Sequence, residues 1–226
     1  MISSLLDALF PACCPACRRP GGVRVCSDCW AARPPVPRGN CPACLGAPPC
    51  RSCVCANGID RVVALGSYED LLVQVVRLLK FHDRRDLARF LGRELAASAN
   101  VLTRPGADST AMNPPPVWIP VPSHRSRVRE RGYDHVRLLA RAAARASGLA
   151  WAPLLTRIHA TPPLYRLTRA ERQSALAGAF RASGRAPERA ILVDDLLTTG
   201  ATALAAAACL REAGARGVDL VVAARA

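Results

Sequence analysis

Long hydrophobic runs are absent from this sequence of 226 residues. No apolar stretch approaches the roughly 20 residues that a helix needs to cross a bilayer. The opening segment, MISSLLDALFP, has no basic residues before its apolar ones and carries Asp7 among them. This is not the pattern of a secretory signal peptide. We therefore expect a cytoplasmic protein without membrane insertion.

Lysine and aromatic residues are also scarce. Lys80 is the only lysine beside thirty arginines, and aromatic residues make up 4% of the chain. A single lysine among so many arginines reflects either codon usage or a role for a compact ammonium group at that position. Half of the residues are apolar, which excludes a disordered chain. The length suits one domain of ordinary size with a small appendage.

Positive charge is concentrated in one part of the chain. The formal net charge is +14, and residues 121–172 carry eleven arginines against three acidic residues. Residues 1–57 carry six arginines against two acidic residues, whereas the remaining segments are nearly balanced. An excess of this kind indicates a polyanionic ligand, either a phosphorylated substrate or nucleic acid.

Cysteine is abundant only near the start of the chain. Ten of the eleven cysteines lie between Cys13 and Cys55, and eight of them form four Cys-x-x-Cys pairs. Two such pairs can complete a closed four-thiolate zinc site, in which the metal is structural. Grouped along the sequence, the predicted ligands are Cys14, Cys17, Cys26 and Cys29 at one Zn²⁺ ion, and Cys41, Cys44, Cys50 and Cys53 at another.

This grouping leaves Cys13 and Cys55 outside both sites, and an interleaved pairing stays open. Disulfides are the alternative, but a cytosolic chain keeps its thiols reduced. The residues between the pairs offer little to bury, so we expect the segment to fold only with metal. We predict a zinc-ribbon-like module over residues 1–57 and a second domain over residues 58–226.

The second domain alternates apolar strands with helical patterns, which predicts an α/β fold with a parallel sheet. We expect strands at 61–67, 117–122, 154–158, 191–193 and 218–223, and helices at 68–81, 86–99, 133–147 and 201–213. The densely basic residues 123–131 follow the second strand as a loop. In such a sheet, ligands bind at the carboxyl ends of the strands.

The segment ILVDDLLTTGAT, residues 191–202, predicts an anion site. Asp194 and Asp195 end a buried strand, and a threonine-glycine turn leads into a helix that begins at Ala201. Free N–H groups and the positive end of a helix bind phosphate there. Two carboxylates can accept hydrogen bonds from vicinal ribose hydroxyls, so the combination favours a ribose 5-phosphate. The alternative is an ordinary connection with two solvated aspartates.

This segment resembles the 5-phosphoribosyl 1-pyrophosphate (PRPP) signature of type I phosphoribosyltransferases. Further elements, in the same order, resemble the ComF family of competence protein F-like amidophosphoribosyltransferase homologues. These elements are the cysteine pairs, Lys80-Phe81, Pro120-Val121-Pro122, Arg131-Gly132-Tyr133, Glu171-Arg172 with Gly178-Ala179-Phe180, and Val193 to Thr202. The chain departs from the family at Asp134-His135, where the family has Asn-Gln.

The resemblance implies a type I phosphoribosyltransferase-like parallel sheet that binds PRPP with Mg²⁺ and transfers phosphoribose to an unknown acceptor. Asp194 and Asp195 would orient the ribose and stabilise positive charge on the sugar ring. Residues 160–180 would form a flap over the ligand. The implied phosphate ligands are Thr198, Thr199, Gly200, Ala201 and Thr202 for the 5-phosphate, and Arg125 and Arg131 for the pyrophosphate.

Two other classes of function stay open at this point. One is a non-catalytic factor that binds single-stranded DNA during DNA uptake or processing, supported by the zinc module and by the basic residues 121–172. The other is a redox sensor that uses the cysteines.

Overall fold

The structure is a computed structural model, which describes residues 13–20, 25–36, 41, 43, 53–103, 114–158 and 178–226. Two of the predicted zinc ligands, Cys44 and Cys50, lie outside the described residues. Residues 160–177 of the predicted flap lie outside them as well.

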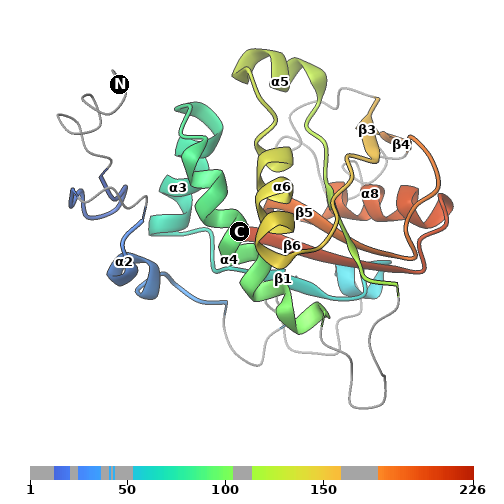
Figure 1. Ribbon diagram of the computed structural model, residues 1–226, viewed down its shortest axis with the longest axis horizontal. Helices are drawn as coiled ribbons and strands as arrows, with labels where there is room; N and C mark the ends of the chain where they lie inside the picture. The colour runs from blue at the N-terminus through green and yellow to red at the C-terminus, as the bar shows by residue number, and fades with distance from the viewer. Residues whose placement is uncertain are drawn as a thin grey trace.

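A four-stranded parallel sheet forms the centre of the fold (Figure 1). Its strand order is β1-β6-β5-β2, with β1 Val62–Ala64, β2 Val117–Pro120, β5 Arg189–Leu197 and β6 Gly217–Arg225. The two long central strands, β5 and β6, are buried along most of their length, as expected for a parallel sheet covered on both faces. The predicted α/β fold with a parallel sheet is confirmed.

Strand β5 is longer than predicted. It pairs with β6 as far as Leu197, which lies opposite Arg225. Asp194 and Asp195 therefore lie inside the strand rather than after its end. The prediction that these two acids end the strand is wrong, because a polar pair does not stop a strand whose backbone groups still have a partner.

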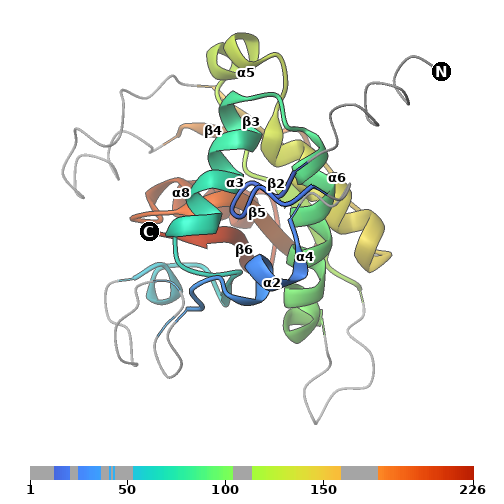
Figure 2. The same ribbon diagram turned by 90° about the vertical axis from the view of Figure 1, so that its left-hand side faces the viewer.

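Helices cover both faces of the sheet. Alternate residues of β5, such as Ile191 and Val193, pack with α3 (Asp70–Phe81), α4 (Asp86–Thr103) and α6 (His135–Ser147) in one core. The residues between them, such as Leu192, pack with α8 (Ala201–Glu212) in a second core. Figure 2 shows α3 and α4 in front of β5 and β6. This division follows from the period of two along a strand.

The cysteine-rich segment contributes to both cores. Cys14 and Val25 belong to the core on the α3 and α4 side, where α2 (Ser27–Ala31) also packs. Cys53 and Val54, at the 3₁₀ turn η1 (Val54–Ala56), belong to the core on the α8 side. Because residues before and after position 57 share these cores, the domain boundary at 57 stays a prediction.

Two elements differ from the expectation. The basic residues predicted as a loop form a short helix, α5 (Arg125–Arg131), which ends at Gly132 with a left-handed φ of 81°. The predicted strand at 154–158 exists as β3 (Leu155–Arg157), but it pairs antiparallel with β4 (Phe180–Ala182) in a separate two-stranded sheet. In Figure 1, α5 lies at the top of the molecule, and β3 lies at its upper right.

Among the described residues, no helix combines the length and the apolar character that a membrane span requires.

The contact between α4 and α6 yields a stability prediction. A Cβ atom at Gly92 would lie 2.4 Å from the Cβ of Ala142 and 2.9 Å from the α6 backbone. Gly92→Ala should therefore lower the free energy of unfolding by about 1–3 kcal/mol, despite a helix-propensity gain of about 1 kcal/mol. Urea unfolding measures the difference.

Gly184→Ala is the matched control, because a Cβ at Gly184 meets no atom within 4 Å. Equal stability of the two variants would show that α4 and α6 do not approach each other this closely.

Candidate functional site at the carboxyl edge of the sheet

The turn after β5 has the predicted shape. Thr198 and Thr199 lead to Gly200, which has a φ of 78° and is the N-cap of the twelve-residue helix α8. Thr198 is exposed, and Thr199 and Thr202 are half-buried. The strand, turn and helix thus present hydroxyl groups and the positive end of a helix at one edge of the sheet.

The space beside Gly200 is not open to a ligand. A Cβ atom at Gly200 would lie 2.1 Å from Cγ1 of Val54. Gly200 is one of the implied phosphate ligands, but on this side its backbone is approached by a side chain of the cysteine-rich segment.

The two aspartates point to opposite faces of β5. Asp195 lies on the face of α3 and α6 and is only 5% exposed. Its Oδ2 accepts hydrogen bonds from Nζ of Lys80 at 2.5 Å and from Nε2 of His135 at 2.8 Å. Asp194 is half-buried on the other side, and its Oδ1 accepts the N–H of Asp195 at 2.8 Å.

The network around Asp195 continues to Arg131. A guanidinium nitrogen of Arg131 lies 2.6 Å from Nδ1 of His135. Because a guanidinium only donates, Nδ1 must be the acceptor and Nε2 must carry the proton that bonds to Asp195. Asp134 caps α6 by accepting the N–H groups of Val136 and Arg137. The Asp-His pair at 134–135 therefore starts the helix and holds Asp195.

The environments of the aspartates move their pKa values in opposite directions. Burial would raise the pKa of Asp195, but Lys80 and His135 outweigh it and hold this pKa below its usual range. Burial raises the pKa of Asp194, and the charge of Asp195 raises it further. Asp195 therefore ionises more readily than Asp194, because the ammonium of Lys80 and the N–H of His135 already engage its oxygen.

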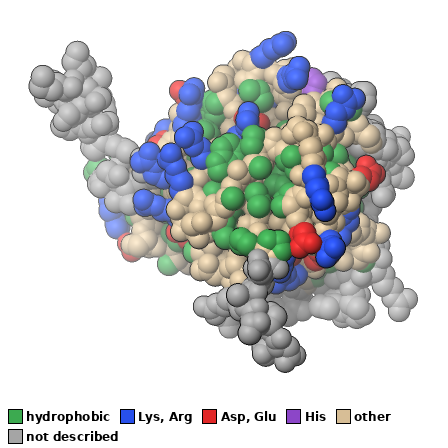
Figure 3. Space-filling model, turned by 45° about the vertical axis from the view of Figure 1, so that its right-hand side comes forward, with side chains coloured by type: hydrophobic (Ala, Val, Ile, Leu, Met, Phe, Trp, Pro, Cys, Tyr) green, Lys and Arg blue, Asp and Glu red, His purple; other side chains and the backbone are tan. Residues whose placement is uncertain are grey.

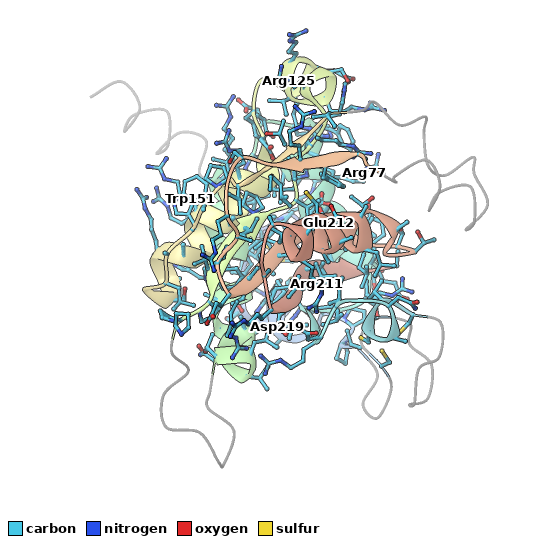
Figure 4. All side chains as sticks on the ribbon, turned by 90° about the vertical axis from the view of Figure 1, so that its right-hand side faces the viewer. Arg77, Arg125, Trp151, Arg211, Glu212 and Asp219 are labelled. Carbon is cyan, nitrogen blue, oxygen red and sulfur yellow. The ribbon has the colours of Figure 1, made fainter. Side chains whose placement is uncertain are left out.

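A basic cavity of about 370 Å³ lies between α5, α6 and β3. Four arginines, Arg125, Arg129, Arg137 and Arg157, line it together with a single acid, Asp134. Within the described part of the chain, the guanidinium groups of the first three form no ion pair. Figure 3 shows blue side chains at the top of the molecule, and Figure 4 labels Arg125 there, on α5.

The cavity adjoins Asp194. Pro120, in its wall, pairs with Val193, the residue before Asp194 on the neighbouring strand. Burial lowers the pKa of Arg157, and the negative charge of Asp194 partly offsets this effect. Among the arginines of the cavity, Arg157 is thus close enough to Asp194 for the two groups to interact.

The two predicted arginines are placed differently. Arg125 lines the basic cavity, whereas Arg131 lines a second cavity of about 250 Å³ beside Lys80. Sequence reasoning missed Arg129, which follows Arg125 by four residues and so shares its helix face. It also missed Arg157, whose position depends on the pairing of β3 with β4 and has no local signal.

The first predicted set of cysteines is brought together. The sulfur atoms of Cys14, Cys17, Cys26 and Cys29 lie within 4.8 Å of one another, and those of Cys17 and Cys26 are 3.7 Å apart. A tetrahedral zinc site with Zn–S bonds of about 2.3 Å separates its sulfurs by roughly 3.8 Å. None of the described cysteines forms a disulfide, in which the sulfurs would be about 2.05 Å apart.

A second group contains a cysteine that the spacing left out. Cys55 lies with Cys41 and Cys53, and the sulfur of Cys41 is 3.8 Å from that of Cys55 and 3.9 Å from that of Cys53. Two of the predicted ligands, Cys41 and Cys53, thus meet as expected. The sequence analysis did not predict Cys55 as a ligand, because Cys53-x-Cys55 lacks the spacing of the other pairs.

Neighbouring groups and burial shift the pKa of three of these thiols. Burial would raise the pKa of Cys14, but backbone N–H groups of neighbouring residues lower it to about 6. Hydrogen bonding to the sulfur of Cys26 raises the pKa of Cys29 to about 12, and burial followed by hydrogen bonding to Cys41 raises that of Cys55 to about 12. A divalent cation would bind the thiolates and remove the repulsion between their negative charges. Both groups therefore have the donors and spacing for a metal such as zinc.

No protein-family model and no curated protein sequence matches this chain. Among solved structures, glutamine PRPP amidotransferase from B. subtilis, in complex with ADP and GMP, is similar with a TM-score of 0.41 and 20% sequence identity. The match covers 66% of this chain and 30% of that chain, so this protein corresponds to less than a third of the amidotransferase. The ligand of this chain is inferred below from its own residues.

Proposed function

We propose that this protein binds PRPP with Mg²⁺ at the carboxyl edge of the sheet and transfers the phosphoribosyl group to an acceptor. The observation that carries the proposal is the basic cavity beside Asp194, at the edge where α8 also begins. The arginines of the cavity suit a diphosphate group, Asp194 suits the sugar hydroxyls, and the start of α8 suits a terminal phosphate.

Each part of the edge has a role in this proposal. The turn at residues 198–202 and the first N–H groups of α8 hold the 5-phosphate. Asp194 accepts a hydrogen bond from a ribose hydroxyl, and the cavity arginines bind the pyrophosphate as charge-assisted donors. Asp195 does not face the same side as Asp194, so we assign it the role of holding Lys80 and His135 in place.

In the proposed transfer, a nucleophilic atom of the acceptor attacks the anomeric carbon while the bond to the pyrophosphate oxygen breaks. Asp194 orients the sugar through its hydrogen bond to the hydroxyl, and negative charge on the leaving group is stabilised by Arg125, Arg129, Arg137 and Arg157. Mg²⁺, which prefers carboxylate and phosphate oxygens, would neutralise part of the departing charge.

Asp194→Asn tests the sugar contact. The variant should lower the affinity for PRPP in the presence of Mg²⁺ at least tenfold, because its Oδ1 would stay with the N–H of Asp195 and a nitrogen donor would replace the oxygen that accepts the sugar hydroxyl. Isothermal titration measures this affinity. Glu212→Gln is the matched control, since it removes one acidic charge at the far end of α8 (Figure 4). Unchanged binding by Asp194→Asn would place the ligand elsewhere.

A second candidate function is favoured by α5. Arg125, Arg127 and Arg129 are all exposed on this helix, as expected for a surface that binds single-stranded DNA through its phosphates. Such binding is sequence-independent and weakens with salt by about 0.7 logarithmic units per contact.

Alanine variants of α5 separate the two candidates. Arg125 and Arg129 line the basic cavity, whereas Arg127 points to the second cavity and lies 3.4 Å from Glu130. If the cavity binds pyrophosphate, Arg129→Ala should lower the affinity for PRPP about tenfold and Arg127→Ala should leave it within twofold. Equal losses in DNA affinity for both variants, without any binding of PRPP, would support the second candidate instead.

We also propose that both cysteine groups hold structural Zn²⁺, with one of the two predicted ligands Cys44 and Cys50 completing the four thiolates of the second group. The purified chain should contain two zinc ions by mass spectrometry of its metal content. Cys17→Ser and Cys55→Ser should each lower the content to one, and Cys209→Ser, in α8 and outside both groups, should retain two. Two zinc ions in Cys55→Ser would exclude Cys55 as a ligand, and a metal-free wild type would favour the redox sensor.

A further inference from the structure

Val54 connects the second cysteine group with the turn at Gly200. It lies between Cys53 and Cys55 in the chain and is only 3% exposed. Its Cγ1 occupies the position that a side chain at residue 200 would need, 2.1 Å from the Cβ site. The first turn of α8 therefore rests on a residue flanked on both sides by cysteines whose sulfurs meet Cys41.

Hydrogen bonds from the residues that follow hold Val54 in this position. The carbonyl of Val54 accepts N–H groups from Asn57 at 3.2 Å and from Ile59 at 3.1 Å. The side-chain amide of Asn57 donates to the carbonyl of Cys53 at 2.7 Å. The 3₁₀ turn itself has only three residues, too few to be stable alone. Its position must depend on what fixes its ends.

A second link joins the same segment to the end of β5. Arg225, at the end of β6, donates from Nε to the carbonyl of Ala43 at 2.6 Å and from a terminal nitrogen to the carbonyl of Leu197 at 3.1 Å. Leu197 is the last residue of β5 before the turn. Arg225 thus supports the start of the turn, and Val54 supports its end. Arg225 bonds to Ala43, two residues after Cys41, and Val54 lies between Cys53 and Cys55, so both residues are connected to the second cysteine group.

We infer that a metal ion held by Cys41, Cys53 and Cys55 positions Val54 against Gly200 and thereby fixes the turn that begins α8. That the turn binds phosphate rests on the function proposed above, but its dependence on the metal does not. Loss of the ion would free the two cysteines that flank Val54, and the N–H groups of the turn would no longer be held in one arrangement. Binding would then include the cost of ordering them.

The first cysteine group provides an internal contrast. It packs in the core on the opposite face of the sheet, next to Trp30. The indole N–H of Trp30 donates to Glu94 of α4 at 2.7 Å, and its ring meets Phe90 edge-on. A metal ion in this group would support α2 against α4, and no contact between described residues joins this group to the turn.

The experiment compares Cys55→Ser with Cys17→Ser in the full chain. Zinc content, amide hydrogen exchange of residues 198–204 without ligand, and affinity for PRPP are measured for both. Each variant should lose one zinc ion. Exchange in residues 198–204 should become at least tenfold faster in Cys55→Ser only, and its affinity for PRPP should fall about tenfold, with Cys17→Ser close to wild type in both respects.

Val54→Ala covers the case in which Cys55→Ser fails to fold. This variant should retain two zinc ions, exchange faster at residues 198–204, and bind PRPP more weakly by a factor of roughly three to ten. Wild-type exchange at these residues in either Val54→Ala or a folded, zinc-depleted Cys55→Ser would overturn the inference. If the wild type does not bind PRPP at all, the proposed function fails, and the exchange rates still decide whether the metal fixes the turn.

Discussion

The arrangement at the carboxyl edge depends on the contacts that the carboxylate of Asp195 makes with Lys80 and His135. One oxygen atom accepts hydrogen bonds from Lys80 at the end of α3 and from His135 at the start of α6, and Arg131 of α5 holds the other nitrogen of the histidine. A buried charge left without a partner is strongly destabilising. The three helices are therefore fixed to the central strand where the sheet ends. The arginines of the basic cavity are carried by two of these helices, α5 and α6, and by β3.

The two adjacent acids, Asp194 and Asp195, have different surroundings in this arrangement. Because side chains alternate along a strand, Asp194 and Asp195 cannot face the same ligand from within β5. Lys80 and His135 lower the pKa of Asp195, while burial raises the pKa of Asp194. The only lysine of the chain is the group that neutralises Asp195. The sequence allowed two explanations for this lysine, codon usage or a role for a compact ammonium group. In the structure the ammonium group has a partner, Asp195.

Local patterns predicted those parts of the fold that depend on neighbours in the chain. The strand, turn and helix around residues 191–213 and the grouping of Cys14 with Cys29 are examples, since each follows from short spacings. Helix α5 escaped prediction because it has four arginines in seven residues and no buried face. Cys55 and Arg157 reach their places through contacts between distant segments, which no spacing in the sequence encodes.

The contact between Val54 and Gly200 affects how the chain can be divided. A fragment that starts at the predicted boundary, residue 58, would lack the side chain that fills the space next to α8. Val54, Cys41 and Cys53 all pack in the core on this face. Their removal would uncover apolar surface along α8, and exposed patches of this kind promote self-association. A fragment from residue 58 onward would therefore lack the part of this core that Cys41, Cys53 and Val54 fill.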